Sequence, residues 1–153
     1  MKIHSYHTQV EWTGNTGKGT ESYKSYERAH LITVDGKPPI AASSDPSFRG
    51  DKTRYNPEDL LVASLSSCHM LWYLHLCSAA GIIVESYTDN ATGEMKEDAD
   101  GGGVFTKVIL KPAVTIKDLS KKREALELHH KANKLCFIAN SVNFEVLHEP
   151  VIN

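Results

Sequence analysis

The longest apolar pattern in the chain lies in residues 60–84, where no Asp, Glu, Lys or Arg occurs. It belongs to the segment NPEDLLVASLSSCHMLWYLHLCSAAG (56–81), which carries the signals of one long helix. Asn56 is a good N-cap and Pro57 suits the first helical position, while Glu58 and Asp59 complement the helix dipole. Gly81 provides a stop. A helix that is apolar all round is typically buried inside a protein, so this segment is expected to form the core helix.

An uncharged segment of this length could instead span a bilayer. However, no second segment of this kind exists in the chain, and no basic cluster flanks this one on one side. The segment also contains polar side chains at Ser64, Ser66, Ser67, His69, His75 and Ser78. These features favour a buried helix over a membrane anchor.

Shorter segments on both sides of this helix predict strands and one further helix. Strands are expected at 2–12, 27–34, 40–43, 82–95, 104–117 and 144–150. A second helix is expected over 118–136, with an apolar face formed by Leu119, Ala125, Leu126, Leu128, Ala132 and Leu135. The order of strands and helices predicts an α+β fold, with residues 1–153 forming a single domain.

Three connecting segments complete this prediction. Residues 14–22, GNTGKGTES, predict a glycine-rich hairpin turn, because the spacing of a phosphate-binding loop is missing. Residues 43–57 predict an ordered loop that leads into the long helix, and 97–103 a flexible acidic connector. The strand at 27–34 is expected to end in a tight turn at Asp35-Gly36.

Composition and charge limit the classes of function. Net charge is −2 and charged residues make up 24% of the chain, which is ordinary for a soluble globular protein and favours neither nucleic acid nor anionic lipid as a partner. The N-terminal residues lack the apolar core of a secretory signal. Three cysteines without an export signal predict reduced thiols and a cytoplasmic location.

The thiols are the candidate reactive groups. Cys77 follows Cys68 by nine residues, and at about 100° per residue the two lie on opposite faces of one helix. If a redox pair exists within one chain, Cys136 must therefore be a member. Small neighbours, Ser64 and Ser67, leave room for a ligand on the face of Cys68. The alternative is that all three thiols are small buried hydrophobic groups.

A thiol that reacts with peroxide must be a thiolate near pH 7, and a nearby cation is the usual means of lowering its pKa. The interior of the long helix offers no Lys or Arg, so the cation must come from elsewhere in the fold. Arg28, Arg49 and Arg54 are the candidates. For each, the alternative is a solvated surface side chain.

Two segments of the sequence resemble the OsmC/Ohr family, the osmotically inducible and organic hydroperoxide resistance proteins. NPEDLLVASLSSC is similar to the beginning of the family's core helix, where Cys follows Glu by ten residues. HHKANKLCFIANSV is similar to the second motif, a helix that runs into Cys and a short turn. The predicted order of strands and helices agrees over nearly the whole chain.

The resemblance implies a thiol-dependent peroxidase without metal or organic cofactor. Cys68 would attack the O–O bond, Cys136 would resolve the sulfenic acid to a disulfide, and an external dithiol, lipoyl-type in some members, would reduce it. Glu58 and an arginine, Arg49 or Arg28, would hold and activate the site. The resemblance further implies intertwined homodimers with sites at the interface, β-sheets around the buried central helix, and a preference for organic hydroperoxides.

The residues agree with this resemblance in part. Glu58 lies about 15 Å along a straight helix from Cys68, so a partner subunit is favoured as the source of the glutamate in each site. Dimerisation would also cover a helix that is apolar all round. Two departures stand out: Phe137 follows Cys136 where many members have proline, and neither Arg28 nor Arg49 aligns without a shift. Arg49 is nearer to the motif.

Other interpretations stay open. His69 is expected to be a hydrogen-bonded core histidine. Zinc binding by His129, His130 and Cys136 is disfavoured, because zinc sites usually show two close ligand pairs. The protein could also be a non-enzymatic small-molecule binding dimer, with Trp72 and Tyr73 beside the thiol, or a redox sensor that forms the disulfide stoichiometrically.

Overall fold

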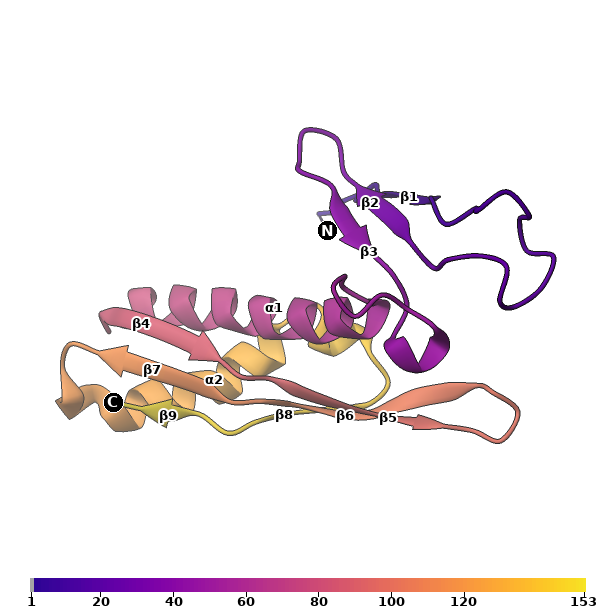
Figure 1. Ribbon diagram of the computed structural model, residues 1–153. Coiled ribbons are helices and arrows are strands. Elements are labelled where there is room, and N and C mark those ends of the chain that lie inside the picture. Colours follow the sequence, from indigo (N-terminus) through magenta and orange to yellow (C-terminus); the bar gives the residue numbers. More distant parts are fainter. Residues whose placement is uncertain (1) are drawn as a thin grey trace. The chain divides into compact units, whose positions relative to one another are not determined.

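A computed structural model describes residues 2–153 and divides into two compact units, one up to Leu60 and one from Leu61 to Asn153. Figure 1 shows the course of the chain through both. The α+β fold expected from the sequence is confirmed. The units are described separately below.

The first unit is a three-stranded antiparallel sheet followed by a loop. Its strands are β1 (Gln9–Trp12), β2 (His30–Thr33) and β3 (Ile40–Ala42), in the order β1-β2-β3. Each is shorter than expected, and the prediction of a strand from residue 2 was wrong. The turn at Asp35-Gly36 is confirmed: Gly36 has a φ of 73°, and the N–H of Lys37 donates to the carbonyl of Val34 at 3.0 Å.

The long helix α1 (Pro57–Ala79) begins and ends where its residues predict. The side chain of Asn56 accepts the N–H of Asp59 at 2.7 Å, and the Asp59 carboxylate accepts the N–H of Asn56 at 3.4 Å. This reciprocal cap satisfies two donors that the helix leaves free. At the other end, Gly81 adopts a φ of 67° and its carbonyl accepts a hydrogen bond from Lys121 Nζ at 2.9 Å.

The second unit contains two three-stranded sheets, ordered β4-β7-β9 and β5-β6-β8. Their strands are β4 (Val84–Asp89), β5 (Thr92–Glu97), β6 (Gly103–Leu110), β7 (Pro112–Ile116), β8 (Glu145–His148) and β9 (Val151–Ile152). β4 and β7 pair antiparallel, as do β5 and β6, whereas β8 and β9 run parallel to β6 and β7.

The strands expected at 82–95 and 104–117 each divide in two, at neighbouring points of the paired chains. The Asp89 carboxylate holds this break: it accepts the N–H of Lys111 at 2.6 Å and the hydroxyl of Ser66 at 2.5 Å. Pro112 has no N–H to donate. One long hairpin thus contributes to both sheets. The acidic connector at its tip is a turn closed by the N–H of Asp98 on the carbonyl of Gly102 at 2.8 Å.

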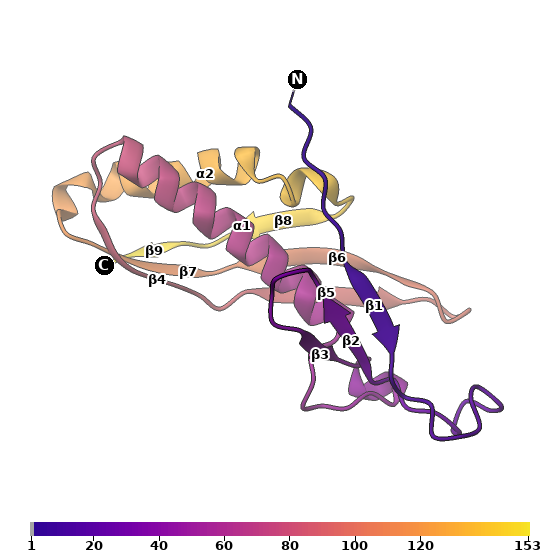
Figure 2. The same cartoon turned by 90° about the horizontal axis from the view of Figure 1, so that it is seen from above.

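The second helix, α2 (Lys122–Leu135), is shorter than the expected 118–136 because a 3-10 turn, η2 (Leu119–Lys121), precedes it. The other 3-10 turns are η1 (Pro46–Phe48) and η3 (Ala139–Ser141). Figure 2 shows α1 lying over the strands of the second unit with α2 beside it. Leu119, which was expected on the apolar face of this helix, is 59% exposed. His129, which was not expected on that face, is fully buried.

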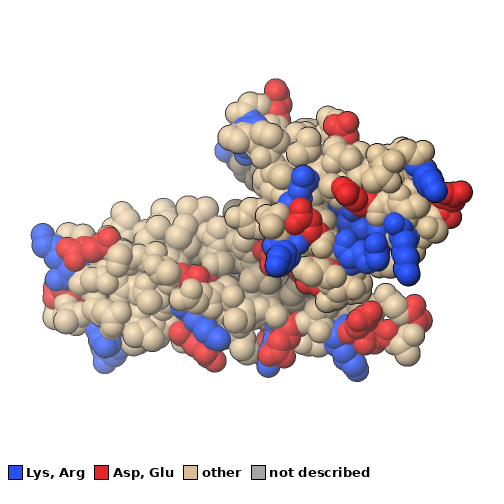
Figure 3. All heavy atoms as spheres, in the orientation of Figure 1, with Lys and Arg blue, Asp and Glu red and all other residues tan. Residues whose placement is uncertain are grey.

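Two clusters of buried side chains support this unit. The larger joins both helices to β4, β7 and β9 and includes Tyr73, Cys77, Val114 and Ile152. The smaller surrounds Leu65. By length and composition alone α1 could cross a membrane, a test that core helices of soluble proteins also pass. In Figure 3 the surface in the region of α1 carries few charged groups.

Candidate functional site

The Cys68 side of α1 borders an open cavity of about 580 Å³ with mostly apolar walls. α1 contributes Ser64, Ser67, Cys68, Leu71, Trp72 and His75, and the segment after α2 contributes Phe137 and Ile138. The small serines leave the space that the sequence predicted beside the thiol. Trp72 and Phe137 meet edge to face across the cavity wall, with ring centroids 5.7 Å apart. The cavity can therefore accept an apolar molecule next to a partly exposed thiol.

Cys136 reaches the same place from the end of α2. Its thiol lies near that of Cys68, close enough for Cys68 to raise the pKa of Cys136, and both cysteines are free. Burial, followed by this proximity to Cys68, raises the pKa of the Cys136 thiol to about 11. The N–H of Ala139 points at Cys136 Sγ from 3.4 Å. The structure thus brings together the two cysteines that the sequence proposed as a pair.

Cys77 lies on the opposite face of α1, as its spacing predicted. It is 1% exposed and packs in the larger core cluster, where burial raises the pKa of its thiol. Tyr73 faces the same core, stacked on His129 with ring centroids 3.8 Å apart. The prediction that Tyr73 lies beside the reactive thiol was therefore wrong, whereas Trp72 does line the cavity.

No Lys or Arg is among the described side chains that line the Cys68 cavity. Arg28, one candidate cation, is held within the first unit. Its guanidinium donates to the carbonyls of Tyr26 at 2.5 Å and Tyr23 at 2.8 Å, and lies 4.0 and 4.3 Å from their ring centroids. These bonds and cation–π contacts fix its orientation.

Arg49 and Arg54 lie in the loop before α1. Together with Arg28 they line a cavity of about 300 Å³ within the first unit, which also includes Glu27 and Asp51. Arg54 pairs with Asp51 at 3.6 Å. No ion pair involves Arg49 within residues 2–153, and its φ of 64° lies in the region that favours glycine. Backbone strain at a charged, exposed residue is a feature of functional loops.

The loop around Arg49 is held by its own hydrogen bonds. The Asp45 carbonyl accepts the N–H groups of Phe48 at 2.9 Å and Gly50 at 3.1 Å, and the Ser43 hydroxyl accepts the N–H of Asp51 at 3.0 Å. A side chain at Gly50 would place its Cβ 1.6 Å from the carbonyl oxygen of Ser44. The ordered loop expected from the sequence is confirmed.

Glu58 lies in the first turn of α1. Its Oε2 atom is buried and has no hydrogen-bond partner among the described residues. A buried carboxylate oxygen without a donor carries a large desolvation cost, and a guanidinium group is the donor that best offsets it.

The sequence did not reveal a cluster of four histidines on the other side of α1. His69 Nε2 lies 3.0 Å from His129 Nδ1, and both rings are buried, which confirms His69 as a core histidine. Burial lowers the pKa of His69 to about 4 and that of His129 to about 3. His130 and His148 complete the cluster. The apolar spacing around His129, between Ala125 and Ala132, is the signal that could have placed it in the core.

Within residues 2–153, no group of three or more His, Cys, Asp or Glu side chains has an arrangement that could hold a metal ion. His129, His130 and Cys136, considered above for zinc, do not converge on one point. His129 bonds to His69, His130 bonds to His148, and Cys136 contacts Cys68.

Comparison with known proteins places this arrangement in a family. Residues 50–149 match the family OsmC, described as OsmC-like protein. An OsmC-like protein of unknown function from Vibrio cholerae is 36% identical, with a TM-score of 0.85 over 97% of this chain and 100% of its own. No curated protein sequence matches the chain significantly.

More distant solved structures share the fold. An organic hydroperoxide resistance protein from Elizabethkingia anophelis, with thiocyanate bound, is 19% identical with a TM-score of 0.73 over 99% of both chains. An OsmC-like protein from Mycoplasma pneumoniae is 14% identical with a TM-score of 0.74, again over 99% of both chains. At these identities the likeness concerns the fold alone.

Proposed function

The chain belongs to the OsmC-like family, and on this premise we propose that it is a thiol-dependent peroxidase that reduces organic hydroperoxides. The observation that carries the proposal is the contact between the Cys68 and Cys136 thiols at an apolar cavity of about 580 Å³. Two solved relatives of the same fold are named organic hydroperoxide resistance proteins.

In the first step, the Cys68 thiolate attacks the terminal oxygen of the hydroperoxide ROOH. The S–O bond forms as the O–O bond breaks, and the alkoxide leaves as ROH after it takes up a proton. The apolar wall of Leu71, Trp72 and Phe137 binds the organic group R. Hydrogen peroxide has no such group, so it gains nothing from this wall and is the poorer substrate.

In the second step, Cys136 attacks the sulfur of the Cys68 sulfenic acid. A disulfide forms, and the hydroxyl group leaves as water with the proton of the Cys136 thiol. The raised pKa of Cys136 keeps this thiol protonated at neutral pH, so its S–H can donate to the Cys68 thiolate during the first step. An external dithiol, for which we propose the lipoyl type, then reduces the disulfide and is itself oxidised.

A cation is still needed to favour the thiolate, and we propose Arg49 for this role. Arg28 is occupied by two carbonyls, and Arg54 is paired with Asp51. Arg49 has no ion pair among residues 2–153 and lies on a loop held by hydrogen bonds. Glu58, whose buried oxygen lacks a donor, is proposed to bind and orient this guanidinium.

We propose that the working form is a homodimer in the cytoplasm, with each site completed by residues of the partner subunit. Leu71 and Phe137 are 63% and 70% exposed, which is unusual for large apolar side chains beside a reactive group. A second chain would cover them and exclude water from the thiols. The chemistry proposed here requires no metal or organic cofactor.

The test is mass spectrometry of the reduced protein after one equivalent of cumene hydroperoxide, with hydrogen peroxide in parallel. A Cys68–Cys136 disulfide that forms faster with the organic peroxide supports the proposal. Cys77→Ala should react like the wild type, Cys68→Ser should not react, and Cys136→Ser should stop at the Cys68 sulfenic acid. Unmodified thiols, or oxidation spread evenly over the three cysteines, would contradict it.

A non-enzymatic binding protein remains the second candidate, because the same apolar cavity could hold a ligand. In that case the Cys68→Ser variant would still bind the ligand, and the wild type would not consume hydroperoxide. A stoichiometric redox sensor would form the disulfide rapidly but turn over slowly when a dithiol is supplied.

A further inference from the structure

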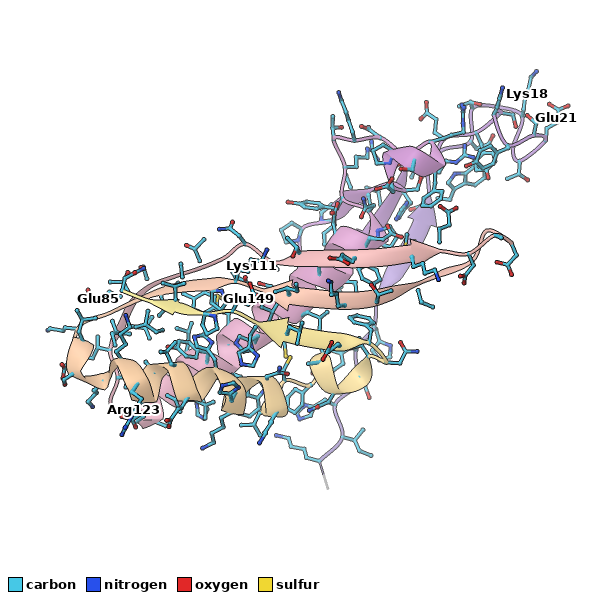
Figure 4. All side chains as sticks on the ribbon, turned by 90° about the horizontal axis from the view of Figure 1, so that it is seen from below. Lys18, Glu21, Glu85, Lys111, Arg123 and Glu149 are labelled. Atoms are coloured by element: carbon cyan, nitrogen blue, oxygen red, sulfur yellow. The ribbon has the colours of Figure 1, made fainter. Side chains whose placement is uncertain are left out.

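A chain of hydrogen bonds joins the last turns of α2 to the end of β8. Asn133 Nδ2 lies 3.0 Å from the carbonyl oxygen of Val146 and 3.2 Å from His148 Nδ1. His148 Nε2 lies 3.0 Å from His130 Nδ1. Figure 4, which views the molecule from below, shows α2 alongside β8.

The partners decide the direction of each bond. The Val146 oxygen can only accept, so the side-chain atom of Asn133 that faces it is the nitrogen, which has a second hydrogen for His148. His148 Nδ1 must then be the unprotonated acceptor, and the neutral ring carries its hydrogen on Nε2. That hydrogen is donated to His130. The bonds therefore run one way, from Asn133 through His148 to His130.

This direction leaves no place for an added proton. A proton on His148 Nδ1 would face the N–H of Asn133, and a proton on His130 Nδ1 would face the N–H of His148. Either event breaks one link of the chain. A proton taken up by His148 would therefore remove its bond to Asn133.

Within residues 2–153, no carboxylate forms an ion pair with His148. From α1, His69 faces it with ring centroids 5.7 Å apart, and from α2, His129 does so at 6.4 Å, in addition to His130. Leu110 is its partner in the register of β6. The charged neighbours along the strands, Lys111 and Glu149, are both exposed. Burial, and then the proximity of His130, lower the pKa of His148.

The same bonds fix the turn that carries Cys136. The carbonyl of Asn133 accepts the N–H of Cys136 at 3.3 Å, and the carbonyl of Cys136 accepts the N–H of Asn140 at 3.0 Å. Asn133 therefore ties the Cys136 turn to α2 through its backbone and to β8 through its side chain. Loss of the Asn133–His148 bond would leave the last turn of α2 on β8 with the Val146 bond alone.

We propose that Asn133 and His148 are positioning residues for Cys136 and that, with His130, they form a latch released by acid. At neutral pH the latch holds the last turn of α2 on β8, with Cys136 beside Cys68. Proton uptake by His148 breaks its bond to Asn133 and loosens the Cys136 turn, while the bond from Asn133 to the Val146 carbonyl remains. Its importance for catalysis rests on the function proposed above, whereas the latch itself can be tested without peroxide.

The first experiment is hydrogen exchange of the reduced full-length protein between pH 8 and pH 5, with rates corrected for intrinsic pH dependence. Protection of residues 133–139 should fall at least tenfold more than protection of α1 around Cys77. The matched variant is His148→Gln, whose side-chain oxygen accepts from Asn133 and whose amide donates to His130 without titrating. It should keep the protection at pH 7 and lose the extra fall in acid.

The latch is refuted if His148→Gln shows the same acid-dependent fall as the wild type, or if residues 133–139 and α1 lose protection together. Asn133→Asp provides a second test, because a carboxylate there would accept from an imidazolium. The pKa of His148, followed by NMR, should rise in this variant, and an unchanged pKa would contradict the contact.

The catalytic consequence is tested by the rate of Cys68–Cys136 disulfide formation after cumene hydroperoxide. The loss of Cys68 thiolate in acid slows both proteins equally, so the rate of His148→Gln is divided by that of the wild type. This ratio should rise several-fold from pH 7 to pH 5. A constant ratio would remove the role in positioning Cys136. If neither protein forms the disulfide, the function proposed above fails, while the exchange experiment still decides the latch.

Discussion

The two faces of α1 have similar composition and opposite roles. On one face, Cys68 is partly exposed at an apolar cavity and lies near a second thiol. On the other face, nine residues later, Cys77 is 1% exposed and surrounded by core side chains. Both are cysteines on one helix, and no Asp, Glu, Lys or Arg lies within seven residues of either. What distinguishes them is which other elements pack against each face.

One helix can thus bury one thiol in the core and leave another at a cavity. Covering one face with α2, β4, β7 and β9 supplies the burial that stabilises the unit. On the other face, the small side chains of Ser64 and Ser67 leave space beside the Cys68 thiol.

The largest expected effect is on activity. Cys68→Ser should reduce hydroperoxide consumption at least about 100-fold, a loss of about 2.7 kcal/mol of transition-state stabilisation, because the nucleophile is removed. Cys77→Ala, on the opposite face, should change the rate less than twofold. Consumption of cumene hydroperoxide with excess dithiol measures both. Equal losses in the two variants would mean that the faces do not differ in function.

The next effect is on stability and has the opposite distribution. Tyr73→Ala removes a fully buried ring from the core and should lower the free energy of unfolding by about 3–5 kcal/mol. Leu71→Ala, on the cavity face, removes a side chain that is 63% exposed within one chain, so a cost above about 0.5 kcal/mol would come from its cover in the proposed dimer. Urea denaturation of both variants checks this. A similar cost for both would show that the cavity face is also buried in solution, as in a dimer.

Acid should weaken the buried face. His69 and His129 have folded-state pKa values of about 4 and about 3, below the ordinary 6.5, so the unfolded chain takes up protons first as the pH falls. Stability is therefore full above about pH 6.5 and falls as the pH approaches 4, by about 3 kcal/mol for one such group. Denaturation midpoints between pH 7 and pH 4 measure this.

His69→Gln is the matched control for this pH dependence. It removes one titrating ring, so its loss of stability between pH 7 and pH 4 should be smaller than that of the wild type. An equal loss in both proteins would assign the acid sensitivity to other groups.

The smallest effect concerns the cavity wall. Within one chain, Phe137→Ala should change the free energy of unfolding by less than about 0.5 kcal/mol, because the ring is 70% exposed there. It should raise KM for cumene hydroperoxide several-fold, since about 1 kcal/mol of contact with the substrate ring is lost. Kinetics with hydrogen peroxide serve as the control, and there KM should not change. An equal rise for both peroxides would remove Phe137 from substrate binding.

Much of the fold was predictable from local signals. The limits of α1 followed from Asn56, Pro57 and Gly81, because caps and stops act over one helical turn. The strands at 82–95 and 104–117 were predicted as elements but not as two pieces each. Their division depends on the Asp89 carboxylate reaching Lys111, which is far along the chain. The final strand β9 was missed because its two residues give no periodic pattern.

The candidate site was predictable in part. The spacing of Cys68 and Cys77 excluded their pairing and left Cys136, which the structure brings into contact with Cys68. Tyr73 was assigned to the wrong face, because an all-round apolar helix gives no sign of which side is covered. The sequence also did not determine which arginine is available to the site. In the structure, Arg28 is bound to two carbonyls and Arg54 is paired with Asp51, which leaves Arg49 as the candidate.

By itself, the sequence determined the long apolar helix, its caps, the opposite faces of its two cysteines and the family resemblance, because these depend on neighbours within a few turns or on short motifs. The tertiary structure alone decided which face of α1 is open, that Cys136 meets Cys68, and that four histidines gather between α1, α2 and β8. Those contacts join residues up to about half the chain apart. They arise from the packing of whole elements, which local patterns do not encode.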